Sequence, residues 1–119
     1  MNRCFAIGAL LAGAGVLLGA FGAHALSDLP PKPLGWWHTA TQYLFIAAVG
    51  IMLDGLRDSA SRFFRRPALG LAVGTLLFSG SLYAMALGAP RGLGAITPIG
   101  GLSLVAGFMW MGVAALRRR

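Results

Sequence analysis

The chain has 119 residues, of which 57% are hydrophobic and only 11% are charged, and its formal net charge is +7. Because a soluble domain carries about 25% charged residues, this composition excludes a water-facing globular domain and indicates an integral membrane protein. Eight of the ten basic residues flank apolar segments, a pattern that orients helices, so nucleic acid is not an expected partner.

The first apolar segment, residues 4–26, has two interpretations. It begins after Arg3 and ends in Ala23-His24-Ala25, as a cleaved signal peptide does. However, no charged residue occurs between Arg3 and Asp28, whereas a signal-peptide apolar core is typically about 7–15 residues long. Small residues also recur at intervals of four and three positions: Gly8, Ala12, Gly15, Gly19 and Gly22. This spacing forms one helical face suited to permanent packing against a neighbour, so we expect the segment to be retained.

Three further segments are long and apolar enough to cross ~30 Å of hydrocarbon, which takes about 20 residues: 36–56, 67–88 and 95–116. The sequence therefore predicts an all-α integral membrane protein, an antiparallel four-helix bundle that forms a single transmembrane domain over residues 1–119. Between the first two segments, Leu29-Pro30-Pro31-Lys32-Pro33 is predicted to be non-helical because proline lacks a backbone N–H. The adjacent Trp36 and Trp37 are predicted to form an aromatic belt at the outer interface.

The basic residues predict an orientation. Four spans place both termini and the middle loop on one side, which then carries eight arginines: Arg3, Arg57, Arg62, Arg65, Arg66, Arg117, Arg118 and Arg119. The other side carries only Lys32 and Arg91, so the positive-inside rule predicts that both termini are cytoplasmic. The loop and C-terminal arginines either contact anionic lipid headgroups, helped by Phe63 and Phe64, or serve only as a solvated topology signal.

Polar side chains gather in the outer third of the predicted membrane region: His24, Gln42, Tyr43, Ser81, Tyr83 and Thr97. They are either ordinary polar helix ends, with serines bonded to the preceding turn, or the rim of an outward-opening pocket. Such a pocket would hold a lipid headgroup, a quinone head or a small solute. It requires the two tyrosine hydroxyls and the His24 ring to point toward one another.

The sequence contains no recognisable catalytic machinery. It lacks the G-x-S-x-G, H-E-x-x-H and Walker patterns, and its two histidines have no nearby acidic or thiol partner, so no enzyme, cofactor or metal site is expected. Asp54 lies near the inner end of the second segment, three residues before Arg57, and is expected to pair there or extend toward the interface.

Small residues also mark the third and fourth segments. Gly15-x-x-x-Gly19 and Gly70-x-x-x-Gly74 are small-x-x-x-small motifs, and the fourth segment carries Gly100, Gly101 and Gly107. Because small side chains let membrane helices approach closely, these positions are predicted to be helix-packing sites.

Three stretches resemble the signatures of a known family: GAFGAHAL (residues 19–26), LFSGSLY (77–83) and GAITPIGGLSLVAG (94–107). The family is domain of unknown function 423, small four-helix membrane proteins with bacterial and eukaryotic members. The resemblance spans nearly the whole chain and implies a four-helix protein of a bacterial inner membrane that keeps its first segment, but it implies no activity. The matching residues are Gly19, Gly22, His24, Ser79, Gly80, Ser81, Tyr83, Thr97, Pro98, Gly100 and Gly101.

One departure from the family pattern bears on function. Many members resemble Tyr-Gln-x-x-His in the second helix, whereas here Leu44 follows Tyr43 and Ala47 stands at the histidine's place. This favours a structural or subunit role for the present chain.

Together these observations predict a non-enzymatic inner-membrane protein whose small-residue faces pack its own helices and also a second copy or a larger membrane complex. The expected lipid partners are anionic and lie on the cytoplasmic side. The alternative is a lipid-, quinone- or solute-binding or transport module that uses the outward polar pocket.

Overall fold

The computed structural model describes residues 2–58 and 62–117, and over these residues the chain is helical and has no strand. Its elements are α1 (Arg3–His24), α2 (Pro31–Arg57), the short 3-10 helix η1 (Phe63–Arg65), α3 (Pro67–Ala86), a second 3-10 helix η2 (Arg91–Ala95) and α4 (Thr97–Arg117). The four α-helices are long and apolar enough to cross a membrane. The predicted all-α four-helix membrane bundle is therefore confirmed.

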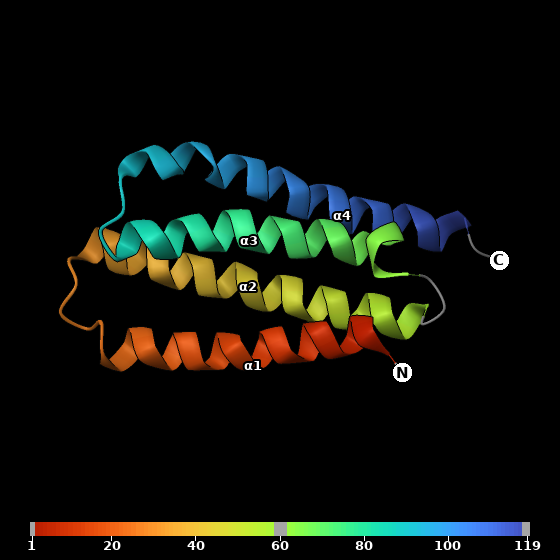
Figure 1. Ribbon diagram of the computed structural model, residues 1–119, viewed down its shortest axis with the longest axis horizontal. Helices are drawn as coiled ribbons and strands as arrows, with labels where there is room; N and C mark the ends of the chain where they lie inside the picture. Colours follow the sequence, from red (N-terminus) through yellow and green to blue (C-terminus); the bar gives the residue numbers. More distant parts are fainter. Residues whose placement is uncertain (1, 59–61, 118–119) are drawn as a thin grey trace.

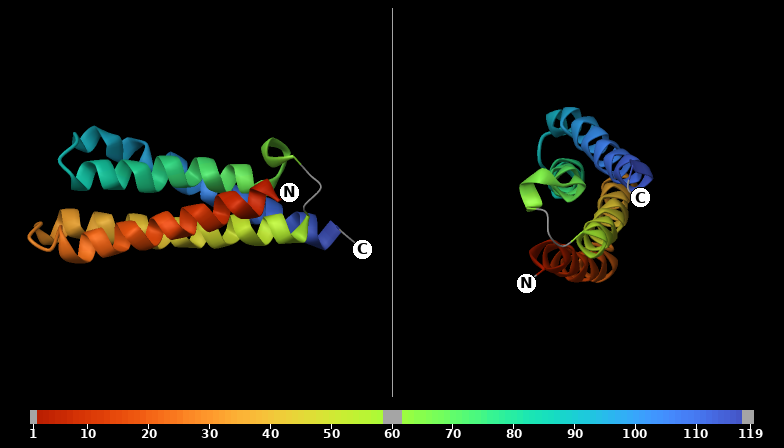
Figure 2. Two further views of the ribbon diagram at one scale, coloured as in Figure 1. Left: turned by 60° about the horizontal axis from the view of Figure 1, so that its bottom comes forward. Right: turned by 90° about the vertical axis from the view of Figure 1, so that its right-hand side faces the viewer.

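The helices lie side by side in chain order, and consecutive helices are antiparallel (Figure 1). Helix packing is concentrated between consecutive helices, so α1 and α4 lie at opposite ends of the row (Figure 2). The start of α1, η1 and the end of α4 share one end of the bundle, which we call the terminal end. The other end, with η2 and the α1–α2 connection, is called the opposite end.

The second helix begins earlier than predicted. Residues 31–33 were expected to be non-helical, but α2 begins at Pro31 and includes Lys32 and Pro33. The prediction was wrong because the first N–H groups of a helix have no intrahelical partner, so proline is tolerated in the first turn. With 27 residues, α2 is roughly 40 Å long at 1.5 Å per residue and exceeds the hydrocarbon thickness.

Trp37 also differs from its expected place in an aromatic belt. Only 2% of its surface is exposed, and its indole Nε1 donates a hydrogen bond of 2.8 Å to the Leu18 carbonyl of α1. Adjacent residues on a helix point about 100° apart, so Trp36 and Trp37 cannot share one outward direction. Gly22 leaves the space that the Trp37 ring fills.

A glycine turn ends α3. Gly88 has φ of 106°, a left-handed conformation that favours glycine, and its N–H donates to the Met85 carbonyl. The N–H of Ala89 donates to the Ala84 carbonyl across 2.9 Å. These two bonds form a Schellman cap, which satisfies carbonyl groups at the end of α3 before η2 leads into α4.

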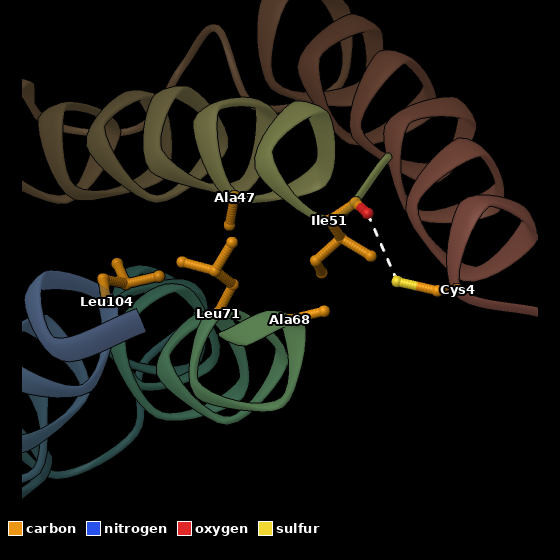
Figure 3. Packing of buried hydrophobic residues seen from close by; sticks show 6 residues of the cluster. All are labelled: Cys4, Ala47, Ile51, Ala68, Leu71 and Leu104. Carbon is orange, nitrogen blue, oxygen red and sulfur yellow. Dashed lines mark hydrogen bonds between the residues drawn. The ribbon is translucent and has the colours of Figure 1, made fainter. Parts of the chain in front are cut away.

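The main core lies between α2 and α3, with one side chain each from α1 and α4 (Figure 3). Its buried members are Cys4, Ala47, Ile51, Ala68, Leu71 and Leu104. Ala47, which stands where the family pattern has histidine, is fully buried among these apolar side chains. The position therefore contributes packing in this chain and offers no polar group.

Candidate functional site

The face of α1 that meets α2 is made of small residues. All four buried residues of this helix are small, namely Cys4, Gly8, Gly15 and Gly22. A Cβ added at Gly8 would lie 2.8 Å from the Ala48 carbonyl oxygen, and one at Gly15 would lie 2.7 Å from Leu44. Of the other two positions in the predicted stripe, Gly19 approaches Thr41 less closely and Ala12 is half-buried.

Helices α3 and α4 approach each other closely along most of α3. A Cβ added at Gly70 would lie 3.2 Å from the Gly107 Cα, and one at Gly74 would lie 2.7 Å from Leu104. Gly100 lies against the backbone of Phe78, whereas a Cβ added at the neighbouring Gly101 would lie 3.6 Å from the Phe78 ring. These glycines allow dispersion contacts between backbones, which drive helix association where the surroundings are as apolar as the helices.

Hydrogen bonds connect consecutive helices towards both ends of the bundle. Towards the opposite end, Trp37 binds the Leu18 carbonyl, Ser79 donates to the Ala40 carbonyl across 2.7 Å, and Ser81 pairs with Thr97. Towards the terminal end, Cys4 Sγ donates to the Ile51 carbonyl and Ser103 Oγ donates to the Gly70 carbonyl. The buried polar groups thus connect the helices of the protein itself.

The six candidate pocket residues occupy separate places. Tyr83 pairs with Thr41, their hydroxyl oxygens 2.6 Å apart, and its ring packs on Trp37 with centroids 4.4 Å apart. Ser81 and Thr97 bond to each other between α3 and α4. The hydroxyl of Tyr83 thus bonds to Thr41 and not to Tyr43 or His24.

The remaining three candidates lie outside these pairs. Tyr43 is 41% exposed, and its ring packs on Phe78 with centroids 4.9 Å apart. There it lines an apolar groove of about 470 Å³ formed by α2, α3 and α4. His24 and Gln42 are exposed, and neither side chain has a hydrogen bond to another part of the chain that the structure describes. The structure therefore does not gather the six side chains around one cavity.

A buried ion pair, which the sequence indicated only in part, joins α2 to α3 at the terminal end. Asp54 is fully buried, and its two carboxylate oxygens accept from Arg57 Nη2 at 2.8 Å and Arg66 Nε at 2.9 Å. The expected pairing with Arg57 is confirmed. Oδ2 also accepts from the backbone N–H of Ala68 in the first turn of α3 at 3.1 Å, where the helix dipole favours a negative charge.

Arg66 differs from the other arginines predicted to be topology or headgroup residues. Its exposed fraction is 3%, and besides the Asp54 carboxylate it donates to the backbone carbonyls of Asp54 and Asp58. The guanidinium is therefore held inside the protein and not in the headgroup layer. Arg62, Arg65 and Arg117 are exposed, whereas Arg118 and Arg119 lie outside the described residues.

A second stripe of small residues lies on the outer side of α1. Ala6, Gly13 and Ala20 are seven residues apart and exposed, on the side of α1 opposite Gly8, Gly15 and Gly22, and the exposed side chains of Leu10 and Leu17 lie beside them. A Cβ added at Gly13 would meet nothing within 4 Å. Exposure reveals this stripe, because the sequence alone does not show which face of a glycine-rich helix is already covered.

Comparisons with known proteins place the chain among uncharacterised membrane proteins. Residues 18–101 match the family described as protein of unknown function (DUF423). The chain is 41% identical over 105 residues to the UPF0382 inner membrane protein YgdD of Escherichia coli strain K12. The aligned residues cover 86% of this chain and 80% of that protein. It is 41% identical over 116 residues to the UPF0382 membrane protein YwdK of Bacillus subtilis strain 168, covering 94% and 92%. No solved structure matches the chain significantly.

Proposed function

This chain belongs to the DUF423 family, and we propose that this multi-pass inner-membrane protein works as a non-enzymatic assembly subunit that docks through α1. The partner is a transmembrane helix, either from a second copy or from a larger complex. The proposal includes the orientation with both termini in the cytoplasm, which is supported by the exposed arginines at the terminal end.

The observation that carries the proposal is the uncovered stripe of Ala6, Gly13 and Ala20. Glycine inside a helix is destabilising by about 1 kcal/mol relative to alanine, so an open glycine calls for a reason. On the other side of α1, glycines at the same seven-residue spacing are covered by α2. Small residues on a lipid-facing surface let a second backbone approach closely, as α2 does on the covered face.

The distribution of polar groups supports a packing role over a binding role. The buried hydroxyl groups of the described chain bond to its own carbonyls or to each other, as Ser79, Thr75 and the Ser81–Thr97 pair do. The described residues contain no cluster of three histidine, cysteine or acidic side chains that could hold a metal. The chemistry offered to a partner is therefore mainly surface shape.

A native gel in mild detergent tests this proposal on protein expressed at its natural level. Wild type is expected to migrate well above the mass of a monomer, and Gly13→Leu is expected to migrate as the monomer. Gly112→Leu is the matched control, because Gly112 is also exposed in a helix with nothing within 4 Å, but it lies on α4. A monomeric wild type, or equal behaviour of the two variants, would overturn the proposal.

A further inference from the structure

We infer that the groove between α1 and α3 holds an acyl chain of one anionic phospholipid, whose phosphate lies with Arg3 and Arg65 at the terminal end. This inference goes beyond the proposed assembly role and concerns a different face of α1. It follows from an apolar groove of defined size and from the charges at one of its ends.

The groove exists because α1 and α3 both pack mainly on α2 and make few contacts with each other. It has a volume of about 450 Å³ and is lined by Ile7, Leu10, Leu11, Ala72, Thr75 and Leu76. Ile7, Leu10 and Leu76 are exposed, and the Thr75 hydroxyl is bonded to the Leu71 carbonyl within α3. The lining therefore offers hydrocarbon-like surface and no free polar group, as an acyl chain requires.

Positive charge lies at the terminal end of this groove. Arg3 is exposed and lies on the same face of α1 as Ile7 and Leu10, one and two turns further along. Arg65 and Arg62, also exposed, lie in or beside η1, immediately before α3. Viewed along the bundle, the start of α1 and η1 lie on the same side of α2 (Figure 2).

The helix directions add to this charge. Because α1 and α3 run in the same direction, both present their N-termini at the terminal end, and helix N-termini carry partial positive charge. Of the two acidic residues at this end, Asp54 is paired with Arg57 and Arg66 inside the protein, and Asp58 is half-buried at the end of α2. Neither Arg62 nor Arg65 makes a side-chain ion pair within the described part of the chain.

The complementary ligand is therefore one molecule with a negative headgroup and a long apolar tail. A zwitterionic lipid offers the tail without the net charge, and inorganic phosphate offers the charge without the tail. Basic residues at a membrane surface attract anionic lipid by an amount that corresponds to about fivefold in affinity for each residue.

Native mass spectrometry of the detergent-solubilised protein with added lipid tests the inference. Wild type is expected to retain one phosphatidylglycerol in preference to phosphatidylcholine with the same chains. Arg3→Gln with Arg65→Gln is expected to lower that preference by roughly 30-fold. The matched control, Lys32→Gln with Arg91→Gln, removes the same charge at the opposite end and is expected to bind like wild type.

Two further arms test the tail and the headgroup separately. Ala72→Phe places a large ring in the groove and is expected to weaken phosphatidylglycerol retention. If this variant does not fold, Ile7→Ala with Leu76→Ala shortens two exposed lining residues and is expected to have the same effect. Inorganic phosphate at the same concentration is expected not to displace the lipid. Unchanged retention in the folded groove variants, equal loss in both charge variants, or displacement by phosphate would each overturn the inference.

Discussion

The Nε atom of Arg66 lies 2.9 Å from Oδ2 of Asp54, and both side chains are almost completely buried where α2 gives way to α3. Twelve residues separate them in the chain, so this pair closes the α2–α3 hairpin. A buried charge is tolerated only when it is paired and hydrogen-bonded, and Asp54 has donors on both oxygens. The pair therefore fixes how the two central helices meet.

Removing one partner of this pair is expected to be more damaging than removing both. Asp54→Leu leaves the Arg66 guanidinium buried without its carboxylate and should lower the free energy of unfolding by about 3–5 kcal/mol. The double variant Asp54→Leu with Arg66→Met should recover much of that loss, because the nearly inaccessible Arg66 charge is removed, whereas Arg57, which also loses its carboxylate, is 24% exposed to the surroundings. Unfolding by denaturing detergent measures both, with Asp28→Asn in the exposed connection as a control expected to resemble wild type.

The neighbouring glycines of α4 are expected to respond differently to alanine. A Cβ at Gly100 would lie 2.8 Å from the Phe78 Cα and force the two backbones apart, a change we expect to destabilise the bundle by about 1–3 kcal/mol. A Cβ at Gly101 would make ordinary contacts of 3.6 Å and 3.7 Å with the Phe78 ring. Thermal unfolding of Gly100→Ala and Gly101→Ala compares them, and equal stability would contradict the packing described for α3 and α4.

The cap of α3 gives a conformational prediction. Gly88→Ala should lower stability by about 1–2 kcal/mol, because alanine in the left-handed region brings its Cβ close to the following carbonyl. Gly92→Ala, in the exposed 3-10 helix that follows, provides the same substitution without a positive φ. Thermal unfolding in one detergent should separate the two variants, and a neutral Gly88→Ala would argue against the turn described for Gly88.

The two tyrosines are expected to differ when their hydroxyl groups are removed. Tyr83→Phe breaks the bond to Thr41 and should cost about 0.6 kcal/mol, the average for hydrogen bonds between membrane helices. Tyr43→Phe should leave stability unchanged, because no hydrogen bond of its hydroxyl occurs within the described residues. A double-mutant cycle with Thr41→Val measures the coupling, and zero coupling between Tyr83 and Thr41 would show that the bond contributes nothing.

The helices could be predicted from the sequence because hydropathy and length decide whether a segment spans a bilayer. The arrangement of the helices in space could not be predicted in this way. Every helix carries small residues, and the spacing of these residues along the sequence does not say which helix face meets which neighbour. Trp37 shows the limit, since an aromatic residue near an interface usually belongs to a belt, and only the space beside Gly22 turns its ring inward. Arg66 shows a second limit of the sequence. A loop arginine within an arginine cluster resembles a topology signal, and only the short distance between Arg66 and Asp54 identifies it as part of a buried ion pair.

The candidate pocket shows how depth alone can mislead. The sequence places His24, Tyr43 and Tyr83 at similar levels in the membrane, but the direction of each side chain depends on its helix's rotation. Thr41 and Tyr43 are two residues apart on α2 and so point to nearly opposite sides. Tyr83 meets Thr41 on one side, and Tyr43 meets Phe78 on the other.

The most direct test of an assembly role for α1 is cysteine cross-linking in intact membranes, in a Cys4→Ser background that keeps a hydrogen-bond donor at position 4. Gly13→Cys is expected to form a cross-linked product of higher mass, with a second copy or with another membrane protein, whereas Gly112→Cys on α4 is expected to stay uncross-linked. A Gly13→Cys protein that remains monomeric under conditions that label its thiol, or one that cross-links no more than Gly112→Cys, would contradict docking through the outer face of α1.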